Sequence, residues 1–393
     1  MAERLKVTQV ITRLVNGGAQ RVVLDLLRRL PKDEFELTLI AGPQAEEGSL
    51  WKEAEGLGIN LVTIPSLVRE LNPLKDFAAL RALKRHFQTN QPDVVHAHTS
   101  KAGLLACVAA RKAKVPKVIY TPHGHIFAKG ANIPGVPSRG LKRTLLMKMR
   151  KKAHRAADWT IALNTVDQRE QVELGLCPAS KMRILRNGID CKRFSPAGLE
   201  ARAKIRSSLK IAPDAIVVAC VARLSFEKGL DILADAWPPF RARMKGKDRE
   251  CVLLIAGEGG MRAMLEASLP STKSVRFLGE VKDPERVYRA ADLVVVPSRY
   301  ESQGLVALEA MACGVPVVAA YVGGLAEAVR DGHTGLLCPP EDPKGMAAAM
   351  ARIAKSRSLL REYGEAGRKQ ALEFYSLERM VGEHAALYRE GLV

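Results

Sequence analysis

The stretch "VVVPSRYESQGLVALEAMACGVPVVA", residues 294–319, contains two apolar runs with a helical segment between them. Its first run, rich in β-branched residues, is typical of a buried strand, and Gly304 and Gly314 mark the two ends of the helix. The second run follows Gly314 at once. This spacing predicts a strand–helix–strand unit in a parallel sheet that is covered on both faces.

The same alternation of short apolar strands and amphipathic stretches continues along the whole chain. The expected strands before the middle of the chain are "LKVTQVI", "FELTLIA", "INLVTI", "DVVHAH", "KVIYT" and "WTIAL", and those after it are "AIVVACVA", "CVLLIAG", "SVRFLG", "LVVVPS", "VPVVAA" and "GLLCP". Between the two sets, "RNGIDCKRFSPAG" at 186–198 is rich in turn formers and indicates an interdomain linker. We therefore expect two doubly wound α/β domains, residues 1–190 and 191–376.

Composition fits two such domains and a reducing compartment. The 393 residues are 47% apolar and 26% charged, as in globular proteins. The seven cysteines are scattered without a Cys-x-x-Cys pair, which argues against a disulfide framework or a zinc ribbon. The N-terminus has no stretch typical of a signal peptide, and no apolar run approaches the roughly 20 residues of a membrane span. We expect a cytoplasmic protein.

The net charge of +19 is concentrated in one part of the chain. Between Asp93 and Asp158 there is no acidic residue and there are 14 Lys and Arg, which favours anionic partners. Within this part, residues 139–155 carry eight Lys and Arg and an apolar set at helical spacing, namely Leu141, Leu145, Leu146 and Met149. This is typical of a helix lying on an anionic membrane, and equally of an ordinary helix with a solvated basic face. Few aromatic residues interleave with the cations, which argues against nucleic acid.

Candidate ligand-binding residues follow the expected strands, because ligands bind beyond the carboxyl ends of strands in open parallel sheets. Glu301 lies in the loop after one strand, beside the helix start at Ser302–Leu305, whose amides can hold a phosphate. Glu309 is the single charge of an apolar helix, and such a carboxylate is costly unless something pairs with it. The alternative is structural: Glu309 pairs with a core arginine or backbone amides, and Glu301 is solvated.

Two further strand ends have residues suited to a diphosphate. In "VARLSFEKG", Arg223 and Lys228 lie on either side of one strand-to-helix turn, the first as a planar fork and the second as a point charge. Gly17 and Gly18 follow the first strand and allow a ligand close to the backbone. Taken alone, each of these features is equally typical of a solvated or tight turn.

Two His-x-His pairs follow strands in the basic region, His96 with His98 and His123 with His125. Such pairs can bind a metal, which would make the protein a metal-dependent hydrolase, but no carboxylate lies nearby in sequence to complete a site. Neutral histidines also donate and accept hydrogen bonds. We predict that His123 is a binding residue with Lys101 beside it and that His96 is structural, and we leave His98 and His125 open.

Taken together, these residues resemble the family 4 retaining glycosyltransferases of the GT-B fold. The most specific part is the Glu-x7-Glu pattern from Glu301 to Glu309, supported by "VARLSFEKG", "NGID" at 187–190, the early Gly-Gly, "HTSKAG" and "YTPHG". The resemblance implies two facing Rossmann-like domains, an N-terminal one that binds the acceptor and a C-terminal one that binds a nucleotide sugar. It also implies that a last helix, within 377–393, crosses back onto the first domain.

The resemblance assigns roles to particular residues. Arg223 and Lys228 would hold the donor diphosphate, Glu301 the transferred sugar and Glu309 the ribose. Gly18 would approach the donor phosphate or the acceptor, and His123 would contact the sugar. The remaining donor contacts are expected at Ser302, Gly304 and Leu305, and acceptor contacts at Lys101, His98 and His125. One position departs from the family pattern, since Gln303 stands where an aromatic residue is common.

These roles define the expected reaction. We expect transfer of a hexose from a UDP-linked donor, with retention, to a lipid-linked or polysaccharide-precursor acceptor of the cell envelope. No Asp-x-Asp occurs in the chain, so the departing diphosphate would be stabilised by fixed cations and helix amides, and no metal or other cofactor is expected. The alternatives are the same transfer to a soluble small molecule, a metal-dependent hydrolase, and a nucleotide-sugar binding protein without activity.

Overall fold

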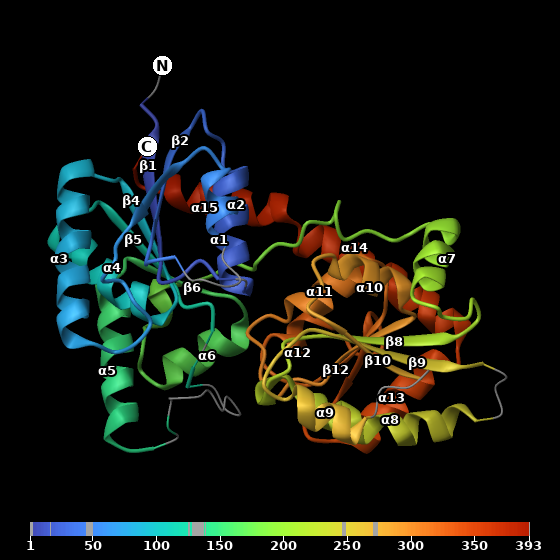
Figure 1. Cartoon of the computed structure of the whole chain (residues 1–393). Coiled ribbons are helices and arrows are strands. Elements are labelled where there is room, and N and C mark those ends of the chain that lie inside the picture. Colours follow the sequence, from blue (N-terminus) through green and yellow to red (C-terminus); the bar gives the residue numbers. More distant parts are fainter. Residues whose placement is uncertain are drawn as a thin grey trace. The chain divides into compact units, whose positions relative to one another are not determined.

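The computed structural model describes residues 3–15, 17–44, 50–124, 126–127, 137, 139–245, 249–269 and 274–392. The chain forms two compact units, each with its own sheet (Figure 1). The described residues up to Gly188 and those from Leu377 onward belong to unit 1, and the described residues from Ile189 to Ser376 belong to unit 2.

Unit 1 is a sheet of seven parallel strands in the order β3-β2-β1-β4-β5-β6-β7. The strands are β1 (Leu5–Ile11), β2 (Phe35–Ala41), β3 (Asn60–Thr63), β4 (Val94–His98), β5 (Lys117–Thr121), β6 (Trp159–Ala162) and β7 (Met182–Ile184). The helices are α1 (Gly18–Arg29), α2 (Trp51–Glu55), α3 (Pro73–Asn90), α4 (Ser100–Lys112), α5 (Leu141–Ala156), α6 (Thr165–Glu173), the 3-10 turn η1 (Ala179–Lys181) and α15 (Leu377–Arg389).

Two apolar cores hold these helices on the sheet. Alternate residues of one strand point to opposite faces, so Val7 of β1 joins the core under α1, α2 and α15, and Val10 joins the core under α3, α4 and α5. Figure 1 shows these two groups of helices on opposite sides of the sheet. In the part of the chain that the structure describes, no helix has the length and apolarity needed to cross a bilayer.

Unit 2 is a sheet of six parallel strands in the order β10-β9-β8-β11-β12-β13. The strands are β8 (Ile216–Val221), β9 (Cys251–Ala256), β10 (Val275–Gly279), β11 (Leu293–Val296), β12 (Val317–Ala320) and β13 (Gly335–Cys338). The helices are α7 (Leu199–Ser208), η2 (Phe226–Lys228), α8 (Leu230–Met244), α9 (Arg262–Ser268), α10 (Pro284–Ala290), α11 (Leu305–Ala312), α12 (Leu325–Ala328), α13 (Pro343–Ala354) and α14 (Arg357–Phe374). One core lies under α8, α9 and α13, and the other under α10, α11, α12 and α14.

The strand orders confirm the predicted fold of two doubly wound parallel sheets. In each sheet the chain runs outward in both directions from a central pair of strands, β1 and β4 in unit 1 and β8 and β11 in unit 2. Loops that leave such a pair diverge, and the crevice between them is the usual ligand site of an open α/β sheet. Ligand-binding residues are therefore expected at the carboxyl ends of these four strands.

Candidate functional site

Lys228 and Glu301 meet at the carboxyl ends of the central strands of unit 2. Lys228 ends η2, which follows β8, and Glu301 lies in the loop after β11. The Lys228 ammonium is 2.5 Å from Glu301 Oε1, and the Ser298 hydroxyl donates to the same oxygen at 3.1 Å. Their side chains are only 24% and 14% exposed, so the pair is set in the protein and partly shielded from water. A partly shielded pair interacts more strongly than one at the surface.

Arg299 holds the loops of this pair together. Its guanidinium donates to both carboxylate oxygens of Asp231, each at 2.8 Å, and to the carbonyl of Phe226 at 2.8 Å. It also pairs with Glu341, and its side chain is 11% exposed. The loop after β11 is thus bound to η2 and to the first turn of α8. We did not identify Arg299 from the sequence. Its local signal is Asp231, an acidic residue in the first turn of α8, and the sequence does not indicate which cation pairs with it.

The loop of Glu301 also packs tightly against the chain at Gly324, which precedes α12. The Gly324 amide donates to the Glu301 carbonyl at 2.8 Å. A β-carbon on Gly324 would lie 2.3 Å from the Ser302 carbonyl oxygen, far inside van der Waals contact. The backbone of the candidate site is therefore held on this side as well, at a distance that only glycine permits.

Arg223 lies at the same strand end and is oriented differently from Lys228. Its side chain is 70% exposed and forms an ion pair with Glu227 at 2.9 Å. An exposed arginine of this kind keeps the freedom to turn toward a ligand, and its current partner contributes little to stability. The role of Arg223 in holding a diphosphate stays a prediction.

Glu309 has a tyrosine as its partner. Tyr288 of α10 is fully buried and its hydroxyl donates to Glu309 Oε2 at 2.7 Å. Burial raises the pKa of Glu309 to about 7, and the Tyr288 hydrogen bond and the charge of Arg193 oppose that rise. The structural alternative predicted a core arginine or backbone amides as the partner of Glu309. The hydrogen-bond partner in the structure is instead Tyr288. Sequence reasoning did not find Tyr288, which reads locally as one more apolar residue of a short helix.

The start of α11 supplies the remaining donor-binding candidates. Gly304 precedes the first residue, Leu305, with φ of +75°, and no side chain caps the helix there. A helix start of this kind attracts anions through its amides and its dipole. Gln303, the position that departs from the family pattern, is buried. These positions lie beside Glu301 in the chain, so the structure keeps the predicted set together.

In unit 1 the candidate histidines that the structure describes differ in burial. His123 follows β5 and is partly exposed, whereas His98 is fully buried and lies behind it, with its Nδ1 2.8 Å from His123 Nε2. Contact between His98 and an acceptor, as expected from sequence, does not fit this burial. His96, which we predicted to be structural, is fully buried and contacts Thr121 and Tyr388. His125 lies outside the described residues.

The three described candidate histidines, His96, His98 and His123, are bonded within the protein. Burial lowers the pKa of His123 to about 3, with a further contribution from His384, and it lowers the pKa of His96 and His98 well below the ordinary value. Both ring nitrogens of His96 and of His98 have partners. Among the described residues, no group of three or more His, Cys, Asp and Glu is placed to hold a metal ion. The geometry gives the hydrolase hypothesis no support there.

A pocket of about 380 Å³ opens in unit 1 at the carboxyl ends of β1 and β4. It contains four cations and no carboxylate among its described lining residues, which are Ile11, Thr12, Arg13, Gln20, Arg69, Leu71, Thr99, Ser100, Lys101, Leu104, Ile126, Leu146, Met149 and Arg150. We call it the basic pocket. Gly18, the first residue of α1, follows the same strand β1 but is not among the lining residues.

The cations of the basic pocket differ in how they are held. Lys101 pairs with Asp76 at 2.5 Å and donates to the carbonyl of Glu70. Arg150 is buried and donates to the carbonyl of Gly124, next to His123, at 2.7 Å. The two apolar residues that α5 turns toward the pocket, Leu146 and Met149, belong to the apolar set noted in the sequence, whereas its Leu141 is 91% exposed.

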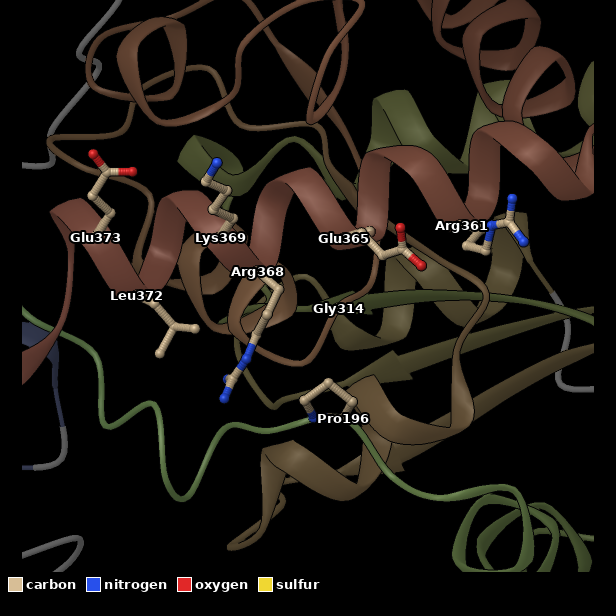
Figure 2. Close-up of a pocket in the computed structure, with 9 residues that line it drawn as sticks. Pro196, Gly314, Arg361, Glu365, Arg368, Lys369, Leu372 and Glu373 are labelled. Atoms are coloured by element: carbon tan, nitrogen blue, oxygen red, sulfur yellow. The ribbon is translucent and has the colours of Figure 1, made fainter.

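A further pocket, of about 730 Å³, lies along α14 in unit 2 (Figure 2). Figure 2 shows Arg368 extending from the helix toward the chain near Pro196. Its guanidinium donates to the carbonyls of Cys191 at 3.1 Å and Phe194 at 2.7 Å, and also to that of Ala312. Arg368 thus ties the first residues of unit 2 to α11. This pocket contains none of the candidate residues.

Comparison with protein families matches both halves of the chain. Residues 16–193 match the model described as glycosyltransferase family 4, and residues 215–356 match the model described as glycosyl transferases group 1. Two similar curated proteins are both named D-inositol 3-phosphate glycosyltransferase. That of Actinosynnema mirum is 38% identical over 71% of this chain and 68% of its own length, and that of Geodermatophilus obscurus is 35% identical over 95% and 84%.

Solved structures show the same fold. The Anabaena protein Alr3699/HepE, solved in complex with UDP and glucose, has a TM-score of 0.80 at 20% identity, covering 98% of this chain and 100% of that one. Sucrose-phosphate synthase from Thermosynechococcus elongatus has a TM-score of 0.81 at 22% identity, covering 98% and 99%. At this identity the likeness concerns the fold alone.

Proposed function

Because the chain belongs to glycosyltransferase family 4, and is thus an enzyme that transfers a sugar, we propose that it moves a hexose from a UDP-linked donor to a small phosphorylated polyol. The Lys228–Glu301 pair is the observation that supports the proposed donor site. Its charged atoms are 2.5 Å apart at the carboxyl ends of β8 and β11. The preference for UDP is supported by the complex of Alr3699/HepE, which contains UDP and glucose.

The proposed reaction requires fixed positive groups at the leaving diphosphate. The bond between the anomeric carbon and the diphosphate oxygen breaks, and an acceptor hydroxyl bonds to that carbon on the same face. A phosphate oxygen takes the hydroxyl proton, so atoms and charge balance without a protein base. Lys228, Arg223 and the start of α11 would stabilise the charge on the diphosphate. Glu301 would accept hydrogen bonds from sugar hydroxyls, and Glu309 from the ribose.

For the acceptor, the relatives favour the alternative of a soluble small molecule over the lipid-linked or polysaccharide acceptor that the sequence put first. Both quoted relatives carry a name that includes inositol 3-phosphate. The basic pocket supports an anionic acceptor, because its four cations face no lining carboxylate and its Thr12, Thr99 and Ser100 hydroxyls suit a polyol. Arg13 and Arg69 are the cations best placed to take a phosphate, since Lys101 and Arg150 are bonded within the protein.

One observation keeps the lipid-linked acceptor as a second candidate. On α5, Leu141 is 91% and Leu145 is 55% exposed, on a helix that also carries many cations. Exposed leucines beside lysines and arginines favour contact with an anionic membrane. A peripheral position on the inner face of a membrane would follow from this candidate and not from the first.

A panel of acceptors tests the proposal. With UDP-glucose and other UDP-hexoses as donors, we expect transfer to D-inositol 3-phosphate and a loss of at least 10-fold in kcat/KM with unphosphorylated inositol, because each charged hydrogen bond is worth about 1.5–3 kcal/mol. Arg69→Ala should raise the KM for that acceptor and leave the KM for the donor unchanged. Transfer only to a polyprenyl phosphate presented in anionic vesicles would contradict the soluble acceptor and support the second candidate.

The raised pKa of Glu309 predicts a pH-dependent donor affinity. Ribose hydroxyls donate more strongly to a carboxylate than to a carboxylic acid, and with a pKa of about 7 the ionised fraction of Glu309 rises as the pH rises. If only the ionised form binds, UDP-glucose affinity should increase about 10-fold from pH 6 to pH 8. UDP-glucose is the suitable ligand because its phosphates do not titrate in this range. Calorimetry without acceptor measures the affinity, and Glu309→Gln should bind more weakly and with no pH dependence.

A further inference from the structure

A chain of hydrogen bonds in unit 1 joins the last helix to His123. Gln9 Nε2 donates to the hydroxyl of Tyr388 on α15 at 2.8 Å, and Gln9 Oε1 contacts His98 Nε2 at 2.5 Å. His98 Nδ1 in turn contacts His123 Nε2 at 2.8 Å. Gln9, His98 and Tyr388 are all fully buried. None of these three has a role in the transfer proposed above, so a different reason is needed for so many buried polar groups.

The direction of each bond follows from the amide of Gln9. An amide nitrogen only donates and an amide oxygen only accepts, so His98 Nε2 must carry a proton. Burial, with the nearby His96 adding, lowers the pKa of His98 well below its ordinary value, so the ring is neutral and has one N–H. His98 Nδ1 is then an acceptor, and His123 Nε2 donates to it.

Tyr388, at the end of the hydrogen-bond chain opposite His123, is also held by other residues. The Tyr388 hydroxyl accepts from Gln9 and therefore donates to His96 Nδ1 at 2.8 Å, and His96 Nε2 contacts the Thr121 hydroxyl at 2.7 Å. The buried ammonium of Lys117 donates to backbone carbonyls at the end of α15, including that of Tyr388 at 3.2 Å. The Tyr388 hydroxyl is thus bonded on both sides, to the Gln9 amide and to His96.

His123 itself has an unusual backbone. Its φ is +57°, a left-handed conformation that is unfavourable for a residue other than glycine. Such residues persist where the surroundings determine them, and they gather at functional sites. Here the ring is held by His98, and the next peptide is held by Arg150 through the Gly124 carbonyl.

We infer that Tyr388 is a positioning residue, whose hydroxyl fixes the proton of His123 on Nε2. It acts through Gln9 and His98, and it leaves His123 Nδ1, a buried atom, as the ring nitrogen that carries no proton. The role of His123 in transfer rests on the proposed function. The assignment of its proton to Nε2 does not depend on that function.

The test is Tyr388→Phe in the full-length protein, studied by nitrogen NMR of labelled histidine. In the unaltered protein we expect the protonated nitrogen of His123 to be Nε2, with the His123 signals identified by their loss in His123→Gln. Without the hydroxyl the Gln9 amide can turn over, so we expect signals of both His123 tautomers and a fall in turnover of about 10-fold, a cost known for partners that fix a histidine tautomer. UDP affinity should not change. Gln9→Met removes the central amide of this hydrogen-bond chain. We expect the same changes in the histidine signals and in turnover.

Thr160→Val is the matched control. It removes a buried hydroxyl of the same unit that contacts another histidine, His154, at 2.9 Å, outside this chain of bonds. It should lower the unfolding temperature about as much as Tyr388→Phe does, since each variant loses one buried hydroxyl, and it should leave turnover within about twofold. A proton on His123 Nδ1 in the unaltered protein, or equal turnover in Tyr388→Phe and Thr160→Val, overturns the inference. A protein with no transferase activity would contradict the proposed function, while the NMR result would still decide the tautomer.

Discussion

Lys228→Met is expected to lower turnover by about 10²–10³-fold, the range measured when one preorganised donor to a developing oxyanion is removed. Methionine has nearly the length of lysine and no charge, so packing around η2 changes little. The loss has two parts. The departing diphosphate loses its most shielded cation, and Glu301 loses the ammonium that holds its carboxylate at 2.5 Å. The decrease should be in kcat as well as in kcat/KM, because the new negative charge develops only as the bond to the diphosphate breaks.

The control for this change is Lys344→Met, which removes an exposed lysine from α13 in the same unit and should leave kcat within about twofold. The measurement is steady-state transfer at saturating donor, with thermal unfolding recorded for both variants. A Lys228→Met enzyme that kept more than a tenth of its turnover would remove Lys228 from the proposed site.

The fold and the donor-site candidates were predictable because their signals are local. A β-branched run such as "LVVVPS" shows a buried strand, and glycine marks the helix start at Gly304, so the strand end where Glu301 lies follows from a few residues. The rule for parallel sheets then places Lys228 at the same edge, although the two residues are 73 positions apart. No side-chain contact needs to be known for that step.

The partners of the candidate residues could not be predicted, because they depend on contacts between distant segments. Gln9 and Tyr388 are 379 positions apart, and nothing in the β1 sequence LKVTQVI indicates that Gln9 contacts a residue near the end of the chain. Tyr288 and Arg299 likewise lie in segments whose pattern is that of any helix or loop. Glu309 shows the limit clearly: the sequence predicted that it needs a partner, and only the structure shows that the partner is Tyr288.

Gly324→Ala is expected to lower turnover by about 10²-fold while the protein stays folded. The φ of Gly324 is −69°, which alanine adopts without strain, so the effect comes from contact alone. The new β-carbon would lie 2.3 Å from the Ser302 carbonyl oxygen and 2.6 Å from Gln303 Cα, both of them backbone atoms that cannot turn away. The segment from Glu301 to Gly304 must therefore move, and a displacement of about 1 Å at reacting groups costs on the order of 10²-fold.

Stability should fall by about 1–3 kcal/mol in the same variant, the usual cost of overpacking. Gly198→Ala is the matched control, because it adds the same methyl group in unit 2 where nothing lies within 4 Å. It should cost less than about 1 kcal/mol, as a change at the start of α7, and leave turnover unchanged. Turnover of both variants, compared with their unfolding temperatures, separates the displacement of Glu301 from a general loss of stability. Equal turnover in the two would mean that the backbone at Ser302 yields without disturbing the site, and that the close packing at Gly324 serves the fold alone.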